Sequence, residues 1–119
     1  MAKARVLVVD DEPAVLRLVA SILQSAGYET VTAPGPRQAL EIVTIRGGFD
    51  VVVSDVVMPE MCGPELAGQI RLLSPSSAIL LMSGCTLTGN LPENVSFLGK
   101  PFVAKDLLRA VDRLLQASP

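Results

Sequence analysis

The chain has 119 residues, and half of them are hydrophobic, a size and composition that suit one compact domain. Its formal net charge is −2 and its basic residues are scattered singly, so we expect no nucleic-acid interface. Its apolar runs are far shorter than the roughly 18 residues of a membrane span, and the apolar stretch before Asp10 is too short for us to expect a signal peptide there. We therefore expect a cytoplasmic domain without membrane contact. Because the chain has no histidine, Ser-His-Asp and Cys-His catalysis are excluded.

The first half of the chain alternates short apolar runs with amphipathic segments. Residues 5–9 (RVLVV) are a continuous apolar run, which is typical of a strand buried on both faces. Residues 13–26 predict a helix that begins at a proline and ends before a glycine. We expect one face of this helix to lie in the core, with Val15, Leu18, Val19, Ile22 and Leu23. Residues 28–32 predict a second strand and residues 36–46 a second helix.

The second half of the chain continues this alternation. The predicted elements are a strand at 49–54, a helix from Gly63 to about Leu73, strands at 78–82 and 95–99, and a helix at 103–116. Residues 84–94 contain two glycines and a proline, which oppose a helix, so we expect a loop with at most one or two helical turns. Five strands alternating with helices predict an α/β fold, with a doubly wound parallel sheet covered on both faces. We expect residues 1–119 to form one domain.

Polar side chains follow the predicted strands at their carboxyl ends, where open parallel sheets place their chemistry. Asp10 and Asp11 follow the first strand, Asp55 the third, Ser83 the fourth and Lys100 the fifth. If the strand order is 2-1-3-4-5, the first and third strands are neighbours and the three carboxylates converge. Two like charges about 4 Å apart repel by roughly 4 kcal/mol at an effective dielectric constant near 20. Either one carboxylate is protonated or a cation lies among them, and a set of oxygen ligands favours Mg²⁺ as that cation.

Each of these residues also has an ordinary structural explanation. Asp10 or Asp11 can cap the helix that follows, and Asp55 can start a turn. Ser83 can be a loop hydroxyl, and Lys100 can be a solvated surface lysine. Their joint occurrence at four strand ends favours a functional site over chance.

Four segments resemble the receiver domains of response regulators in two-component signalling: VLVVDDE (6–12), VVVSDVVMPEMCG (51–63), LLMSG (80–84) and FLGKPF (97–102). The resemblance covers essentially the whole chain, and its final part is similar to receivers attached to hybrid sensor histidine kinases. It implies a flavodoxin-like five-stranded sheet of order 2-1-3-4-5, with a fourth helix that is shortened here. It also implies a phosphoacceptor domain that is not an enzyme and catalyses only its own phosphorylation and dephosphorylation.

The resemblance implies a Mg²⁺ site and a phosphorylation site at the acidic residues. Asp55 matches the aspartate that takes a phosphoryl group from a phosphohistidine on a histidine kinase or a histidine phosphotransfer domain. Asp11 matches a direct ligand of Mg²⁺, and Asp10 matches its partner, which acts through water. Val57 matches the position whose backbone carbonyl completes the metal site.

The same resemblance implies a conformational switch. Ser83 and Lys100 match the hydroxyl and the amine that bind the phosphoryl group. Phe97 matches the aromatic switch position, which follows the inward movement of Ser83 on phosphorylation; a phenylalanine on a strand can also be a plain core residue. The bond between Lys100 and Pro101 matches a peptide bond that is cis in the family.

Three rival functions share this fold class. A flavodoxin-type or nucleotide-binding domain needs a glycine-rich turn after the first strand, where this chain has DDEP. A phosphatase with an aspartate nucleophile usually has a second acid two residues later, where this chain has Val57. The main alternative is a receiver-fold protein-interaction module without phosphorylation. The intact set of three acids, a hydroxyl and an amine argues against that alternative.

Overall fold

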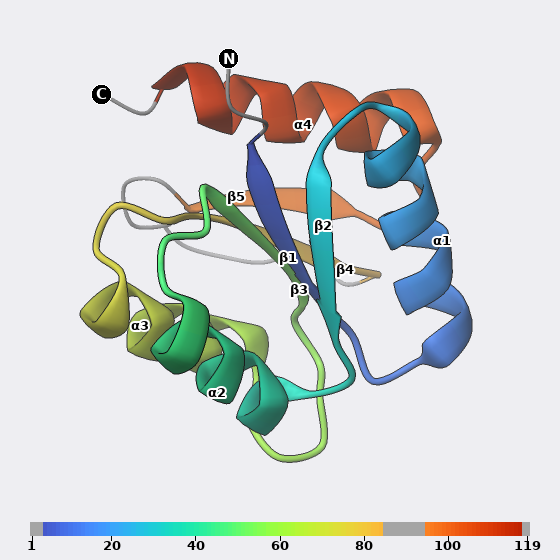
Figure 1. Cartoon of the computed structure of the whole chain (residues 1–119). Helices are drawn as coiled ribbons and strands as arrows, with labels where there is room; N and C mark the ends of the chain where they lie inside the picture. The colour runs from blue at the N-terminus through green and yellow to red at the C-terminus, as the bar shows by residue number, and fades with distance from the viewer. Residues whose placement is uncertain (1–3, 85–94, 118–119) are drawn as a thin grey trace.

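A computed structural model of the chain describes residues 4–84 and 95–117, which form one parallel sheet and its helices (Figure 1). The strand order is β2-β1-β3-β4-β5, which confirms the predicted order. The strands are β1 (Arg5–Val9), β2 (Glu29–Ala33), β3 (Val51–Asp55), β4 (Ala78–Ser83) and β5 (Val95–Gly99). The helices are α1 (Pro13–Ser25), α2 (Pro36–Arg46), α3 (Gly63–Leu73) and α4 (Ala104–Ala117). The predicted loop with its shortened helix falls on residues 85–94, outside the described residues.

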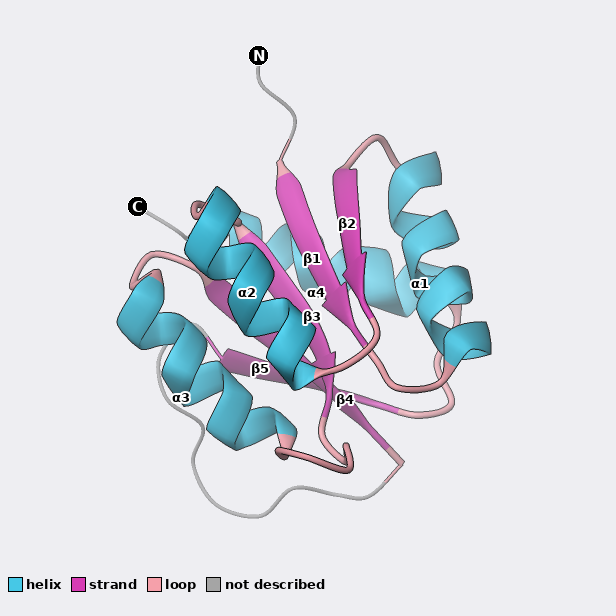
Figure 2. Cartoon of the chain, turned by 60° about the horizontal axis from the view of Figure 1, so that its bottom comes forward, coloured by secondary structure: helices cyan, strands magenta, loops and turns pink. Residues whose placement is uncertain are grey.

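Helices cover both faces of the sheet. Helices α2 and α3 lie in front of it and α4 lies behind it in Figure 2, and α1 shares the face of α4. Successive strand residues point to opposite faces: Leu7 and Val52 belong to the core on the α2 and α3 side, and Val8 and Val53 to the core on the other side. Because both faces are buried, residues 6–9 of β1 and 51–53 of β3 are apolar at successive positions.

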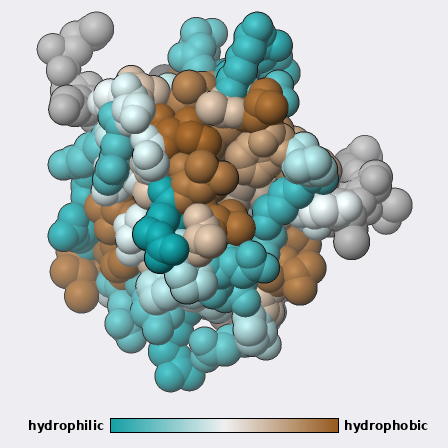
Figure 3. Space-filling view, turned by 90° about the vertical axis from the view of Figure 1, so that its right-hand side faces the viewer, coloured by the Kyte–Doolittle hydropathy of each residue, from teal (hydrophilic) through white to brown (hydrophobic). Residues whose placement is uncertain are grey.

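The prediction that Leu18 lies in the core is wrong, because its side chain is 58% exposed. Val19 and Leu23 occupy the inner positions of α1 and are fully buried. Apolar atoms reach the surface on the side of the molecule shown in Figure 3. Leu18 lies at the flank of α1, where a shallow hollow of about 360 Å³ is lined by Val15, Leu18, Lys100, Pro101 and Phe102.

The third strand begins later than predicted, at Val51 instead of residue 49. Asp50 lies before the strand, and its carboxylate accepts a hydrogen bond from the backbone N–H of Arg5 at 2.8 Å. The guanidinium of Arg5 lies 4.7 Å from the centroid of the Phe49 ring, and its Nε lies 3.2 Å from a Glu29 carboxylate oxygen. These contacts join the start of β1 to β2 and to the turn before β3. No helix among residues 4–84 and 95–117 is long and apolar enough to cross a membrane.

A buried pair of serines supports the turn before β4. The Ser77 hydroxyl donates to the Phe49 carbonyl at 2.6 Å and lies 2.8 Å from the Ser74 hydroxyl. We expect Ser77→Ala to lower the free energy of unfolding by about 1 to 3 kcal/mol, because buried polar groups lose their partner. Urea denaturation measures this loss. Ser76→Ala, at an exposed neighbouring position, is the control and should change stability by less than about 0.5 kcal/mol. Equal losses for the two variants would contradict the prediction.

Candidate functional site

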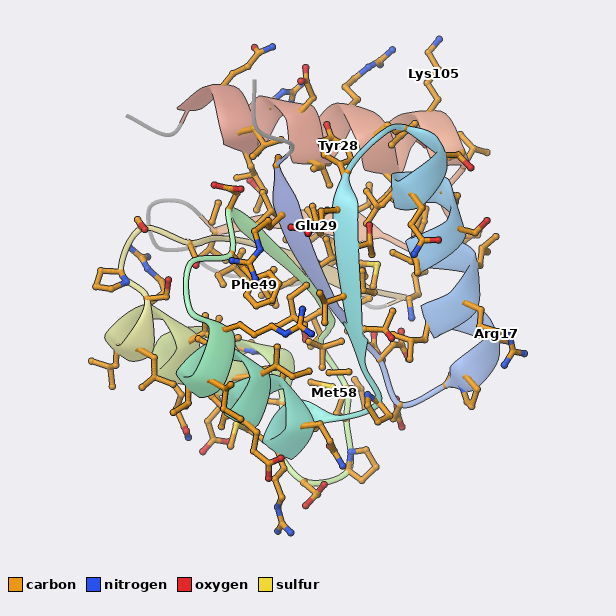
Figure 4. The ribbon with its side chains drawn as sticks, viewed as in Figure 1. Arg17, Tyr28, Glu29, Phe49, Met58 and Lys105 are labelled. Carbon is orange, nitrogen blue, oxygen red and sulfur yellow. The ribbon has the colours of Figure 1, made fainter. Side chains whose placement is uncertain are left out.

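The carboxyl ends of four neighbouring strands meet at one edge of the sheet. Val9 pairs with Ser54, Asp55 with Met82, and Ser83 with Gly99, so β1, β3, β4 and β5 end side by side. Figure 4 shows Met58, just beyond β3, at this edge, and Tyr28 at the opposite one. The register therefore brings the residues that follow these strands to the same edge of the sheet.

Three aspartates converge there, as the sequence predicted. Asp10 and Asp11 directly follow β1, and Asp55 is the last residue of β3. One carboxylate oxygen from each lies within 4.8 Å of the others. Asp10 is buried, the side chain of Asp55 is 13% exposed, and Asp11 is exposed. The cluster therefore extends from the interior to the surface.

Lys100 supplies a positive charge on one side of the aspartates. Its Nζ lies 3.2 Å from Oδ1 of Asp55, to which it donates a hydrogen bond, and 3.8 Å from Oδ2 of Asp10. Its backbone N–H donates to the Ser83 carbonyl at 2.7 Å, which joins the ends of β4 and β5. The peptide bond between Lys100 and Pro101 is cis, as the resemblance implied.

Asp10 has the least favourable electrostatic environment of the site. Its Oδ1 accepts the backbone N–H of Glu12 at 2.9 Å, but its buried Oδ2 has no hydrogen-bond partner among the described residues. Burial raises the pKa of the Asp10 carboxyl above its ordinary value of 3.8, and the neighbouring charges of Asp55 and Asp11 add to the rise. The bond from Glu12 and the ammonium of Lys100 oppose it. An unpartnered carboxylate oxygen beside two further acids suits a bound cation.

The structural alternatives for the two adjacent aspartates can now be judged. The N-cap of α1 is Glu12, and it makes no side-chain capping bond. Neither Asp10 nor Asp11 therefore occupies the N-cap position. Asp10 instead holds the turn between β1 and α1 through its bond to the N–H of Glu12.

The other predicted site residues lie in or just after β3, β4 and β5, the strands that end at this edge. Ser83 ends β4 and is 3% exposed. Val57 follows β3 in the loop to α3, and its apolar side chain is 68% exposed. Phe97 pairs with Leu81 across β4 and β5 and is partly buried against the core on the α2 and α3 side. Two further residues that contact the Asp55 backbone, Ser54 and Gly63, were predicted from the sequence only as parts of a strand and a helix start.

Comparison with known proteins identifies a family over most of the chain. The response regulator receiver domain family matches residues 6–112. The chain is 42% identical to the sensor kinase CckA of Brucella abortus, over 95% of this chain but 13% of that protein. It is 34% identical to the transcriptional regulatory protein GlrR of Escherichia coli, over 97% of this chain and 27% of that protein. The chain thus spans only a minor part of these two relatives.

Solved structures agree in fold over nearly their whole length. The crystal structure of the receiver domain from the hybrid histidine kinase CckA has a TM-score of 0.85 and 34% identity, and the match covers 95% of this chain and 100% of that one. A response regulator receiver protein from Sinorhizobium medicae has a TM-score of 0.87 and 27% identity, covering 97% and 96% of the two chains.

These matches agree with the resemblance seen in the four sequence segments. Receiver domains are signalling domains, phosphorylated by histidine kinases or phosphotransfer proteins, and they bind Mg²⁺ through an acidic pocket. The described residues contain an acidic cluster of this kind. The chain therefore belongs to the response regulator receiver domain family and is a phosphoacceptor domain of two-component signalling.

Proposed function

We propose that Asp55 is the residue that accepts the phosphoryl group, from a phosphohistidine on a histidine kinase or a histidine phosphotransfer domain. One observation carries this assignment: the Asp55 carboxylate lies both 3.2 Å from the Lys100 ammonium and within 4.8 Å of carboxylate oxygens of Asp10 and Asp11. Lys100 donates its hydrogen bond to Asp55, while its distance to the Asp10 carboxylate is longer, at 3.8 Å. The partial exposure of Asp55 leaves it open to a phosphodonor.

The transfer step needs little beyond positioning and charge stabilisation. An Asp55 oxygen attacks phosphorus in line and forms an O–P bond, while the P–N bond to the donor imidazole breaks and its electron pair stays on nitrogen. The Lys100 ammonium offsets the negative charge on the phosphoryl oxygens. The Ser83 hydroxyl, at the end of the neighbouring strand, donates to the transferred group. The domain thereby catalyses its own phosphorylation, and its dephosphorylation by water reverses the modification.

The donor set fits Mg²⁺, a hard cation that prefers carboxylate, carbonyl and water oxygens. We propose Asp11 and Asp55 as direct ligands, Asp10 as the acid that acts through water, and the Val57 carbonyl as the backbone ligand. Oδ2 of Asp10 is buried and has no hydrogen-bond partner among the described residues, and the Lys100 ammonium at 3.8 Å offsets only one of the three negative charges, which supports this assignment. When bound, the ion neutralises the charge that accumulates between the aspartates and the phosphoryl oxygens.

Phosphorylation then changes the conformation around Ser83 and Phe97. The phosphoryl group adds about −1.5 to −2 charge at neutral pH, which draws hydroxyl and amine donors toward it. Phe97 is only partly buried against the core, so an inward movement with Ser83 would bury more of its ring. Such a switch requires two states separated by only a few kcal/mol.

Residues 1–119 are proposed to form one receiver domain, supported by the single sheet with a core on each face. Similarity to CckA supports a place in a phosphorelay of the hybrid sensor kinase type. A cytoplasmic location stays a prediction.

The proposed function is tested with acetyl phosphate, a small phosphodonor that needs no kinase. We expect the wild-type chain to gain the mass of one phosphoryl group in the presence of Mg²⁺. In excess EDTA the rate should fall by more than about 100-fold, because charge stabilisation worth several kcal/mol is lost. Intact-mass spectrometry over time gives both rates. Equal rates with and without the metal would contradict the role of Mg²⁺, and no labelling in either condition would contradict phosphorylation.

A further inference from the structure

Gly63, the first residue of α3, is packed against the backbone that carries Asp55. It is buried, and its N–H donates to the Val56 carbonyl at 2.7 Å. A Cβ placed on Gly63 would lie 2.6 Å from the Asp55 carbonyl oxygen, 2.9 Å from the Val56 Cα and 3.1 Å from Cδ2 of Leu81. Distances below 3.0 Å are essentially never seen for real Cβ atoms, so any side chain here would displace its neighbours.

The identity of those neighbours decides what would move. The two shortest approaches are to backbone atoms of Asp55 and Val56, which cannot rotate away as the end of a side chain can. The Val56 N–H also donates to the Met82 carbonyl at 2.9 Å, which ties this segment to β4. A shift forced by a side chain at Gly63 would therefore be taken up by the loop that leaves Asp55.

Ser54 contacts the same carbonyl from the strand. Its side chain is 1% exposed, and its hydroxyl donates to the Asp55 carbonyl oxygen at 3.0 Å. A hydroxyl is costly to bury beside apolar strand residues unless it is bonded, and this bond satisfies it. The Asp55 carbonyl thus lies between a hydrogen bond from Ser54 and a close backbone approach of Gly63.

We propose that Gly63 and Ser54 are positioning residues for the phosphoacceptor. They hold the peptide between Asp55 and Val56 in one orientation, which sets the direction of the Asp55 carboxylate and of the Val57 carbonyl. The inference rests on the proposed function of Asp55. Reactions in an ordered site are sensitive to such placement, because a misplacement of about 1 Å can cost 10²-fold in rate.

The test compares Gly63→Ala with Gly68→Ala. Gly68 lies in the same helix and is exposed, and apart from its own stretch of helix nothing lies within 4 Å of the position that a Cβ would take, so it is a matched control for the added methyl group. We expect Gly63→Ala to slow phosphorylation by acetyl phosphate about 10- to 100-fold at saturating Mg²⁺. The dissociation constant for Mg²⁺, measured by calorimetric titration, should rise about tenfold. Gly68→Ala should change neither quantity more than about twofold.

The second variant is Ser54→Ala, which adds no atoms. It tests the positioning role even if Gly63→Ala does not fold. Loss of the single Ser54 hydrogen bond should slow phosphorylation at saturating Mg²⁺ about 3- to 10-fold, while circular dichroism shows a folded chain. If both variants fold and both keep the wild-type rate and Mg²⁺ affinity, the inference is overturned. If Gly63→Ala does not fold, the same result for Ser54→Ala alone overturns it. A wild-type chain that neither binds Mg²⁺ nor takes up label would instead refute the proposed function itself.

Discussion

Asp55→Asn is expected to take up no phosphoryl group from acetyl phosphate in the presence of Mg²⁺, a loss of more than about a thousandfold. The amide has nearly the shape of the carboxylate, so it keeps the end of β3 intact. It has no negative charge, however, and is not a nucleophile toward phosphorus. Intact-mass spectrometry measures the uptake directly.

The control for this variant is Asp106→Asn, which removes one negative charge from the exposed first turn of α4. It should be labelled at the wild-type rate. Hydroxylamine gives a second check, because it cleaves an acyl phosphate on an aspartate but leaves a phosphate ester on a hydroxyl intact. Label on Asp55→Asn at the wild-type level, or wild-type label that survives hydroxylamine, would remove Asp55 from its proposed role.

Asp10→Asn is expected to raise stability without Mg²⁺ and to reduce the further stability that Mg²⁺ adds. In EDTA at neutral pH it should raise the free energy of unfolding by about 1 to 3 kcal/mol, because a buried charge with an unpartnered oxygen becomes a neutral amide. That amide can donate to the neighbouring carboxylates. With Mg²⁺, the same variant should gain less stability than wild type, because one acid of the metal site is gone. Urea denaturation followed by circular dichroism measures both differences.

The pH dependence of the same variant has a definite sign. The pKa of Asp10 is raised in the folded chain, mainly by burial, above its ordinary value of 3.8. Between these two pKa values the folded state keeps a proton that the unfolded state has released. Stability in EDTA therefore falls as the pH rises from about 3.8 through the raised pKa of the folded state. This contribution is absent from Asp10→Asn, so the stability difference between variant and wild type should grow with pH across that window.

Two outcomes would contradict this account of Asp10. One is a constant stability difference between wild type and Asp10→Asn from acid to neutral pH. The other is an equal Mg²⁺-dependent stabilisation of both proteins. Asp106→Asn is again the control, since it changes the net charge by the same amount at an exposed position.

The elements of the fold were largely predictable because they depend on local patterns. Strands buried on both faces must be apolar at each position, which made the runs that form β1, β3 and β4 easy to find. Proline marked the start of α1, and glycines marked the ends of α1 and α2. The order of the strands came from the resemblance to a family, since periodicity does not determine which strands are neighbours.

Burial within a helix was less predictable. An apolar stripe indicates which side of α1 faces the sheet, but not how far the packed surface extends around it. Leu18 follows the apolar pattern as well as Val19 does, yet it is 58% exposed while Val19 is fully buried. The width of the buried stripe depends on where β2 and α4 lie against α1, and that arrangement is set by contacts between distant segments.

The sequence by itself determined which side chain follows each strand, and a parallel sheet then brings all of those side chains to one edge. Together with the strand order that the family resemblance implied, this was enough to predict the meeting of Asp10, Asp11, Asp55 and Lys100. Only the tertiary structure decided that Lys100 lies 3.2 Å from Asp55, although the two are 45 residues apart, and that one oxygen of Asp10 is left buried without a hydrogen-bond partner among the described residues. The close approach of Gly63 to the Asp55 backbone was likewise decided only by the tertiary structure. Such distances depend on how separate segments pack against one another, and no local pattern of residue types specifies that packing.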